Sequence, residues 1–467
     1  MRGRSGAGIV PKTFQVHLRS PLKMATSSES MVDTAKRILA NAEAISKYLS
    51  ETGHPAPSFS PYAPDTLLPA DESNPEILAL RTTLLDDTKM LYDLALGPKE
   101  VARWTAYGHN DVAALQYTVR YDIPKFVPLD PQGKEVPTIS YEELADKAAA
   151  AGYPVDAINL KRMLRLCMLN RIFAEPTPGR VAHSASSAIL ARSEAAAAHV
   201  RTITGETFPA APKIVDALEK WGARPEEPWQ CGFCLAFDTG ERSVFEYWSQ
   251  EHPEKLDRLA IGMQDAATDA GWEPSHLRRG FNWAGLGRAK VVDVGGARGH
   301  VSIDLAREFT ELEFVVQDLP AVVQQAKEEL VPTLSSDLAQ RVTYQGHDFM
   351  EPQDVMDADI YLLRHVLHDW SDKYAAKILQ KIVPAMKPGA RILLNDAVLP
   401  AAGELPGVDE HKVRRMDLQM MHSGNARERE QRDWEGVLAR ADPCLKLKNV
   451  IKPPGSTLSV MEVTLEA

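Results

Sequence analysis

Cysteine is scarce in this chain, and long apolar runs are missing. The 467 residues contain 4 cysteines, too few for a disulfide framework, so a reducing compartment is expected. No apolar run approaches the roughly 20 residues that span a bilayer, which excludes a helical membrane protein. Basic residues (53) are outnumbered by acidic residues (64), and the formal net charge of −11 disfavours a phosphate-binding surface. We therefore expect a cytoplasmic protein that binds neither membrane nor nucleic acid.

Two of the cysteines, Cys231 and Cys234, form a Cys-x-x-Cys pair. Such a pair can be redox-active or can supply half of a zinc site. A second pair, or a histidine pair at zinc-finger spacing, would be needed to complete the site, and the sequence contains neither. We therefore expect two half-buried thiols and no metal site.

The first 28 residues contain several basic residues and no acid, with frequent serine and glycine. This composition is typical of a mitochondrial transit peptide. The segment that begins at Met24, MATSSESMVD, is also typical of a natural start. We therefore expect residues 1–30 to be a disordered or wrongly included N-terminal extension, with mitochondrial targeting as the alternative.

Residues 31–200 have the pattern of a mainly helical domain that ends in a winged helix. Apolar residues recur at helical spacing, and the helix VDAINLKRMLRLCMLNRIF is followed by two short extended runs around a Pro-Gly turn. A winged helix can bind DNA through a basic helix, but the acidic chain and the large second domain favour a wing used for packing or dimerisation. The basic residues of this helix are Lys161, Arg162 and Arg165.

From about residue 288 strands and helices alternate. The expected strands are 291–294, 313–318, 341–346, 359–364 and 391–396, and the helices are 300–308, 321–329 and 372–386. Such a series predicts a mostly parallel, doubly wound sheet. The final segments CLKLKNVIK and TLSVMEVTLEA predict an antiparallel edge strand. We expect an α/β domain over 201–467, with its Rossmann-like core at about 288–467.

The first of these strands ends in a glycine-rich turn, VVDVGGARGH. Glycines at the carboxyl edge of a sheet let the backbone approach a ligand closely. A dinucleotide fingerprint needs Gly-x-Gly-x-x-Gly, but from Gly295 the chain reads G-G-A-R-G-H. Asp318 could bind the ribose of either cofactor class. Acids at later strand ends, such as Asp348, suit a cationic sulfonium, so the residues favour S-adenosylmethionine over a nicotinamide cofactor without excluding the latter.

A set of motifs follows in order over about residues 290–440: DVGGARGH, VVQDLP, GHDFMEP, LLRHVLHDWSD, NDAVLP and NAREREQRDW. In these motifs the chain resembles the caffeic-acid-type small-molecule O-methyltransferases, in the form found in fungal secondary metabolism. RIFAEPTPGRVAHS and QCGFCLAFDTGERSVFEYW extend the resemblance toward the N-terminus. The resemblance implies a class I methyltransferase fold, a winged-helix dimerisation domain and a homodimer.

The resemblance also implies a catalytic set. The family's base is the histidine of the HDWSD motif, here His368. Two acids flank and orient that base, and the matching positions are Asp396, where plant enzymes usually have glutamate, and Glu428. His365 lies close by in the same segment and is the other candidate base.

Further family positions imply the binding residues. The cofactor-binding residues are Gly295, Gly296, Asp318, Asp348, Phe349 and Arg364. Ala297 stands where many members have a third glycine, which could weaken cofactor binding. The residues expected to line the substrate pocket are Met420, Met421 and His422.

Together these features predict the transfer of a methyl group from S-adenosylmethionine, released as S-adenosylhomocysteine, to a phenolic or enolic hydroxyl of a small aromatic, polyketide-like metabolite. Methyl transfer from a sulfonium needs alignment and a nucleophile. A phenol titrates near 10, so a histidine base is useful at neutral pH, and no metal is expected. The alternative is a non-catalytic, methyltransferase-like regulator or pathway scaffold that uses the winged helix.

Overall fold

The computed structural model describes residues 30–68, 74–266 and 271–466. The chain divides into two compact units. The first comprises the described parts of Met1–His54, Asp71–Val101 and Pro400–Lys412, and the second those of Pro55–Ala70, Ala102–Leu399 and Val413–Ala467. Most of the predicted N-terminal extension lies outside the described residues. No helix in the described ranges is long and apolar enough to cross a membrane.

The first unit is built on two long helices, α2 (Met31–Glu51) and α3 (Pro75–Leu96), which pack against each other. Arg37 on α2 donates through Nε and Nη2 to the two carboxylate oxygens of the buried Asp87 on α3, at 3.0 and 2.7 Å. A buried carboxylate needs such a partner. Asp86 in turn accepts hydrogen bonds from the backbone N–H groups of Gly407 and Val408, which fixes the start of α21 (Gly407–Gly424) in this unit.

The second unit begins with a helical region that carries a small antiparallel sheet. Its helices are α4 (Pro98–Tyr107, which begins in the first unit), α5 (His109–Arg120), α6 (Ile123–Phe126), α7 (Tyr141–Ala150), α8 (Ala157–Leu169) and α9 (Ala185–Arg192). The strands β1 (Ile139–Ser140), β2 (Ala174–Thr177) and β3 (Arg180–Ala182) pair in the order β1-β3-β2. Leu144, Leu160 and Leu164 are fully buried beneath them. Whether this region is a true winged helix stays a prediction.

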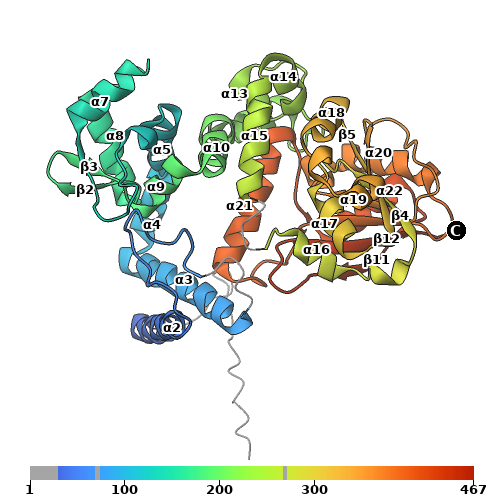
Figure 1. The fold of residues 1–467 in the computed structure, drawn as a ribbon, viewed down its shortest axis with the longest axis horizontal. Coiled ribbons are helices and arrows are strands. Elements are labelled where there is room, and N and C mark those ends of the chain that lie inside the picture. The colour runs from blue at the N-terminus through green and yellow to red at the C-terminus, as the bar shows by residue number, and fades with distance from the viewer. Residues whose placement is uncertain (1–29, 69–73, 267–270, 467) are drawn as a thin grey trace, which may run out of the picture. The chain divides into compact units, whose positions relative to one another are not determined.

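A second group of helices leads into the sheet domain. It comprises α10 (Glu194–Thr202), the π-helical turn Ile203–Thr207, α11 (Phe208–Ala210), α12 (Ile214–Trp221), α13 (Gly232–Phe237), α14 (Val244–Glu251), α15 (Pro253–Ala266) and α16 (Pro274–Gly280). Helices α10 and α15 lie side by side (Figure 1). Gly262 allows this approach, because a Cβ there would lie 2.8 Å from the backbone nitrogen of His199.

The C-terminal part of the unit contains a seven-stranded sheet in the order β11-β12-β8-β7-β4-β5-β6. The strands are β4 (Ala289–Val294), β5 (Leu312–Asp318), β6 (Val342–Gly346), β7 (Ile360–Arg364), β8 (Arg391–Asp396), β11 (Leu445–Ile451) and β12 (Ser459–Leu465). Strands β4 to β8 are mutually parallel. The predicted, mostly parallel sheet is therefore confirmed. The antiparallel strand β12 pairs with β8 inside the sheet, and β11 forms the edge.

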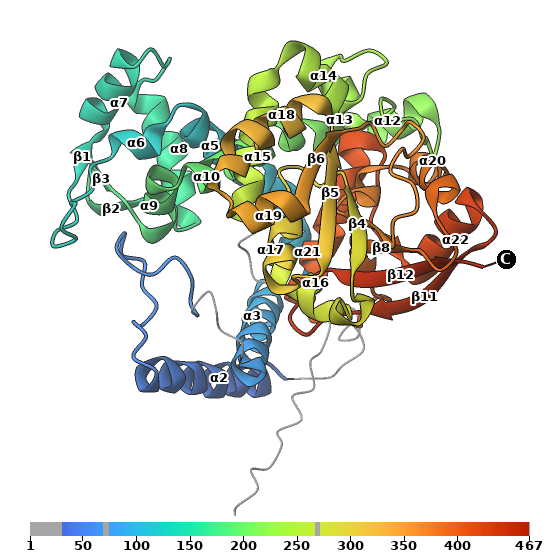
Figure 2. The ribbon, with the colours of Figure 1, turned by 45° about the vertical axis from the view of Figure 1, so that its right-hand side comes forward.

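Helices cover both faces of this sheet. Figure 2 shows α17 (His300–Glu308), α18 (Pro320–Glu329) and α19 (Ser336–Arg341) on one face, and α20 (Asp372–Ile382) and α22 (Gln431–Ala441) on the other. Successive strand residues point to opposite faces. Leu362 and Leu393 accordingly join the core beneath α17, whereas Leu363 and Leu394 join the core beneath α20. Both faces are buried, which explains the nearly continuous apolar strands.

The strand order reverses between β4 and β7, with β5 and β6 on one side and β8 on the other. In open α/β sheets ligands bind outside the carboxyl ends of the strands at such a reversal. Gly295 follows β4 at this point, Asp318 ends β5, and Asp396 ends β8. The fold thus brings several of the predicted site residues to one edge.

Candidate active site

The turn after β4 has a backbone that only small residues can form. Gly295 has a φ of +71°, and a Cβ on it would lie 2.9 Å from Cγ2 of Val366. A Cβ on Gly296 would lie 2.6 Å from Cγ of Asp293. Ala297, where many family members have glycine, has a φ of +48°. It occupies the left-handed region at an energetic cost that glycine would avoid.

Asp318 closes the other side of this turn. Its Oδ2 accepts a hydrogen bond from the backbone N–H of Ala297 at 2.9 Å, and its Oδ1 accepts one from Leu319 at 2.8 Å. Burial raises the pKa of Asp318, and these two hydrogen bonds oppose the rise. The carboxylate is thereby held at the end of β5 with its remaining lone pairs available to a diol.

Phe349 and Asp348 lie in the segment after β6. The Phe349 ring would be 3.7 Å from a Cβ on Gly295 and packs edge-on against Trp370, with ring centroids 5.9 Å apart. Asp348 caps its own turn, because its Oδ1 accepts from the backbone N–H of Met350 at 2.8 Å. The structure therefore brings Phe349 next to the glycine turn and gives Asp348 a local structural bond.

Arg364 ends β7 and is largely occupied by contacts within the protein. Its Nη1 donates to Oδ1 of Asn395 and its Nη2 to the carbonyl oxygen of Trp272, each at 2.5 Å. Burial lowers the pKa of Arg364 to about 10, and the charges of Asp293 and Asp396 oppose this shift. The guanidinium is thus a fixed positive charge beside two acids.

His368 and Glu428 form a buried hydrogen-bonded pair. His368 lies in a 3-10 turn, Leu367–Asp369, directly after β7, and its Nδ1 is 2.8 Å from Oε1 of Glu428. The Glu428 side chain is fully buried, and His368 is nearly so. The other ring nitrogen, Nε2, lies 3.5 Å from Oδ1 of Asp369. This is the arrangement in which a carboxylate fixes the tautomer of a histidine base.

The neighbouring charges strongly affect the pKa of His368. Burial favours the neutral ring, but the carboxylates of Asp369, Glu428 and Asp396 more than offset this effect and raise the pKa of His368 to about 10. A proton on this ring is therefore stabilised by three neighbouring acids. The arrangement suits a group that must accept a proton from a weak acid.

Asp396 lies at the end of β8 and is fully buried. Neither of its oxygens has a hydrogen-bond partner among the described residues. Burial, helped by the negative charges of Glu428 and Asp369 and opposed by His368, raises the pKa of Asp396 to about 7. Of the two acids expected to flank the base, Glu428 makes the hydrogen bond, whereas Asp396 acts on His368 through its charge.

His365, the other candidate base, lies in a different environment. Its ring stacks on Trp272, with centroids 5.0 Å apart, and lies 5.1 Å from the ring of His368. Burial holds the pKa of His365 well below that of an ordinary histidine. Ligand atoms of His365, His368 and Asp396 lie within 4.8 Å of one another, so these three are the candidates for holding a metal ion among the described residues.

The three residues expected to line the substrate pocket lie on α21 (Gly407–Gly424), in its part within the second unit. Met421 lines a cavity of about 230 Å³ together with Asp417 and Ser371. His422 is buried, and its Cβ would be 3.3 Å from a Cβ on Gly232, so it packs against α13. Burial lowers the pKa of His422 to about 4. The structure thus places Met421, rather than His422, at this cavity, and Met420 is half-buried.

Cys231 and Cys234 lie at the start of α13, with their sulfur atoms 3.5 Å apart. Both are free and buried, in a cluster with Phe233 and Trp248. The prediction of half-buried thiols is therefore wrong in degree, because this apolar cluster buries both side chains almost completely.

Two acids that the sequence analysis did not single out, Asp293 and Asp417, accept hydrogen bonds that hold parts of the site in place. Asp293 is buried and accepts a hydrogen bond from Ser302 Oγ at 2.6 Å, which ties β4 to α17 beneath the glycine turn. Burial raises the pKa of Asp293 to about 6. Asp417 accepts from the backbone N–H of Glu428 at 3.0 Å. The apolar run before Asp293 was a visible signal for the first, but nothing near Asp417 in the sequence points to Glu428.

A parallel sheet with a glycine turn after its first strand and an acid at the end of its second defines the class of Rossmann-like proteins that bind a nucleoside cofactor. Comparison with known proteins narrows the class. Residues 227–442 match the family of O-methyltransferase domains. The chain is 37% identical to O-methyltransferase VdtC of Byssochlamys spectabilis, over 92% of this chain and 96% of that protein. It is 34% identical to O-methyltransferase aoiF of Aspergillus oryzae, over 94% of this chain and 100% of that protein.

The fold agrees with these sequences. The crystal structure of OxaC superposes with a TM-score of 0.73 at 21% identity, over 95% of this chain and 100% of OxaC. The chain therefore belongs to the O-methyltransferase family. The predicted resemblance and the predicted S-adenosylmethionine-dependent O-methyltransferase activity are confirmed, and the comparisons give the regulator alternative no support.

Proposed function

We propose that the protein methylates a phenolic or enolic hydroxyl of a small aromatic, polyketide-like metabolite, with His368 as the general base. The observation that carries this proposal is the buried contact of 2.8 Å between His368 Nδ1 and Glu428 Oε1 at the carboxyl edge of the sheet. Two relatives support a small metabolite as the substrate. One, 36% identical, is the grayanic acid biosynthesis cluster O-methyltransferase of Cladonia grayi, and OxaC has a crystal structure with S-adenosylhomocysteine and oxaline.

The residues around the glycine turn fit the cofactor. The turn is packed so closely at Gly295 and Gly296 that a Cβ would lie 2.9 Å from Val366 and 2.6 Å from Asp293, and the Asp318 carboxylate accepts a hydrogen bond from the same turn at Ala297. We assign binding of the ribose hydroxyls to Asp318 and binding of the adenine to Asp348 and Phe349. Arg364 supplies a positive charge beside this cofactor site. When bound, S-adenosylmethionine supplies a methyl group on a cationic sulfur.

The catalytic work of the chain is to prepare the nucleophile. Glu428 accepts the Nδ1 proton of His368, so Nε2 carries the lone pair that takes the proton from the substrate hydroxyl. The imidazolium that results is stabilised by Glu428, Asp369 and Asp396. Its pKa of about 10 is close to that of a phenol, near 10, so proton transfer between the two is nearly balanced. Buried carboxylates thereby make a weakly acidic hydroxyl reactive.

This chemistry proceeds without a metal ion in our proposal. Among the described residues the candidate ligands are His365, His368 and Asp396. His368 Nδ1 already contacts Glu428, and an ion on its Nε2 would occupy the lone pair that the base needs. A bound ion would therefore inhibit the proposed reaction.

We also propose that α21 supplies part of the substrate pocket, with Met420, Met421 and His422 near the aromatic ring. Met421 lines the cavity of about 230 Å³, and methionine adapts readily to flat apolar ligands. The acid-rich composition, with a net charge of −11, supports the absence of nucleic acid as a partner. The cytoplasmic location and the domain limits 31–200 and 201–467 stay predictions.

The first test needs no knowledge of the acceptor. Calorimetric titration with S-adenosylhomocysteine, with NADH in parallel, should give binding of the first ligand and none of the second. A screen of phenolic acceptors with S-adenosylmethionine, read by mass spectrometry, then identifies products that have gained one methyl group. Binding of NADH alone would contradict the proposal.

The base is tested by His368→Ala. We expect a loss of kcat of about 100-fold or more, with unchanged S-adenosylhomocysteine affinity, because His368 does not belong to the glycine turn. His365→Ala is the matched control and should retain most of the activity. Full activity of His368→Ala, or a loss confined to His365→Ala, would remove His368 as the base.

A further inference from the structure

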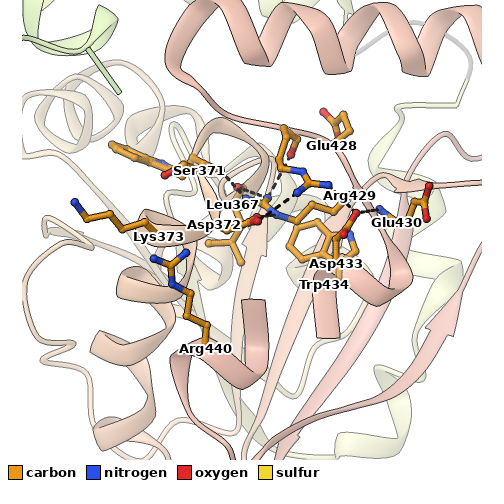
Figure 3. A network of polar contacts seen from close by, with 12 residues as sticks. Leu367, Ser371, Asp372, Lys373, Glu428, Arg429, Glu430, Asp433, Trp434 and Arg440 are labelled. Atoms are coloured by element: carbon orange, nitrogen blue, oxygen red, sulfur yellow. Dashed lines mark hydrogen bonds and ion pairs between the residues drawn. The ribbon is translucent and has the colours of Figure 1, made fainter. Parts of the chain in front are cut away.

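Arg429 directly follows Glu428 in the short strand β10 (Arg429–Glu430) and is fully buried. Its guanidinium points toward the segment that carries His368 (Figure 3). Nη1 donates to the carbonyl oxygen of Leu367 at 2.8 Å, and Nη2 donates to that of Trp370 at 2.6 Å. These two carbonyls belong to the residues on either side of the pair His368 and Asp369. The arginine therefore holds both ends of the turn that presents the base.

The Arg429 guanidinium also pairs with an acid, Asp372. Nε of Arg429 donates to Oδ1 of Asp372 at 2.9 Å, and Asp372 also accepts from Arg427 Nη1 at 3.3 Å and Arg224 Nη2 at 2.9 Å. Asp372 is the first residue of α20, where the helix dipole favours a negative charge. The charges of the arginines, with Arg429 the strongest, lower the pKa of Asp372 against the effect of its burial.

A lysine could not replace these contacts. Arginine presents five donors in a rigid planar fork, whereas lysine has three donors around one point charge. The Arg429 guanidinium also lies over the ring of Trp434, 5.0 Å from its centroid, which favours a flat cation. Burying a charge this completely is costly unless every bond is made. The site thus depends on the shape of the arginine side chain as well as on its charge.

We propose that Arg429 is a positioning residue for methyl transfer, which fixes the main chain of Leu367 and Trp370 relative to Glu428 and so holds His368 Nδ1 against the Glu428 carboxylate. The inference rests on the proposed role of His368 as the base. The geometry supports it because Glu428 and Arg429 are adjacent in the chain. One short segment therefore places the Glu428 carboxylate against the His368 ring and the Arg429 guanidinium against the backbone on either side of that ring. A small displacement of a base can cost about 100-fold in rate.

The test compares Arg429→Met and Arg429→Lys with the matched control Arg440→Met. Arg440 is another arginine of the same region (Figure 3), but its side chain is 46% exposed and pairs with Glu226. Each variant is assayed for S-adenosylhomocysteine affinity by calorimetry, for kcat and KM with an acceptor from the screen, and for the protonation of His368 by NMR of histidine-labelled protein.

We expect Arg429→Met to lose about 100-fold in kcat with little change in KM or in S-adenosylhomocysteine affinity. The His368 ring should titrate at lower pH than in the parent, because Glu428 is no longer held against it. In kcat and in the His368 titration, Arg429→Lys should lie between Arg429→Met and the parent, and Arg440→Met should match the parent. A folded Arg429→Met protein with parental kcat and parental His368 titration would overturn the proposal.

Two further results distinguish failure of the Arg429 proposal from failure of His368 as the base. If Arg429→Met does not fold, Arg429→Lys decides, and an unchanged His368 titration in that variant contradicts the proposal. If His368→Ala remains fully active, the role of His368 as the base fails, whatever Arg429 does. Because the NMR titration needs no acceptor, it tests the positioning role even before a substrate is known.

Discussion

At the scale of single residues, the site is a balance of one imidazole and three acids. His368 gains a proton readily, and Asp396 holds one at a pH where an exposed aspartate would not, because its carboxylate is buried beside other negative charges. Glu428 is the acid that contacts the ring directly. The cluster therefore retains protons near neutral pH, and the pH dependence of both activity and stability should report on it.

The pH dependence of the rate follows from the neutral form of the base. The pKa of His368 is raised to about 10, so below pH 10 the neutral ring becomes about tenfold more abundant with each unit by which the pH rises. We expect kcat/KM to rise from pH 7 and to level off near pH 10. Glu428→Gln removes one of the charges that raise this pKa, so its curve should level off at lower pH and at a lower maximum. Parent and variant are compared with the same acceptor, and superimposable profiles would contradict the assignment.

The stability of the fold should also depend on Asp396. Its pKa is raised to about 7 from an ordinary value of 3.8, so between these values the folded protein holds a proton that the unfolded chain releases. Stability therefore falls as the pH rises through this range. Asp396→Asn does not titrate and escapes the loss. Relative to the parent, its free energy of unfolding should be higher at pH 8 than at pH 5, by roughly 2 kcal/mol.

Thermal unfolding at the two pH values measures this difference. The exposed Asp257 provides the control Asp257→Asn, which removes a charge without removing a buried acid. An Asp396→Asn protein whose stability relative to the parent is the same at both pH values would show that Asp396 does not retain its proton.

At the scale of elements, the site is made by the ends of parallel strands. The turn after β4, the end of β5, the turn after β7 and the end of β8 each contribute one group, and the sheet sets their spacing. The sequence predicted these strands well because each is a local apolar run with turn residues at its end. It could not predict that Asp396 has no hydrogen-bond partner among the described residues, because that depends on the lengths of side chains that meet from different strands.

The glycine turn can be tested as an element. Gly295→Ala places a Cβ 2.9 Å from Val366 in a backbone with φ of +71°. Gly389→Ala is a matched control, because Gly389 has φ of +83° and a Cβ there would meet nothing within 4 Å. Both substitutions carry the left-handed backbone cost of about 1 kcal/mol. We expect only Gly295→Ala to weaken S-adenosylhomocysteine binding, by about tenfold or more in Kd, measured by calorimetry. Equal affinities would exclude the turn from the cofactor site.

At the scale of the whole molecule, the helices α2 and α3 raise the question of the predicted homodimer. Val32, Leu39 and Tyr92 on these helices are 61%, 60% and 59% exposed. Val32 and Leu39 are seven residues apart and lie on the same face of α2, so we propose that this exposed apolar face contacts a second copy of the chain. The buried Arg37 to Asp87 pair gives the two helices a fixed register within their unit.

Sedimentation of the full chain tests this association. We expect a dimer for the parent and a shift toward monomer for the double variant Val32→Glu and Leu39→Glu, because two charges would be buried at the interface. Val215 is 61% exposed on α12, so Val215→Glu is the matched control and should stay dimeric. A monomeric parent, or equal dimerisation of all three proteins, would contradict the role of α2.

The sequence by itself determined the order of strands and helices, the glycine turn and the cofactor class suggested by its motifs, and its family motif proposed His368 as the base. Each of these depends on residues that are close together in the chain. Only the tertiary structure decided that Glu428 bonds His368, that Arg429 bonds the backbone on either side of the pair His368 and Asp369, and that β12 lies inside the sheet. His368 and Glu428 are 60 residues apart. Contacts over such distances are set by how strands and side chains pack in three dimensions, which local periodicity does not encode.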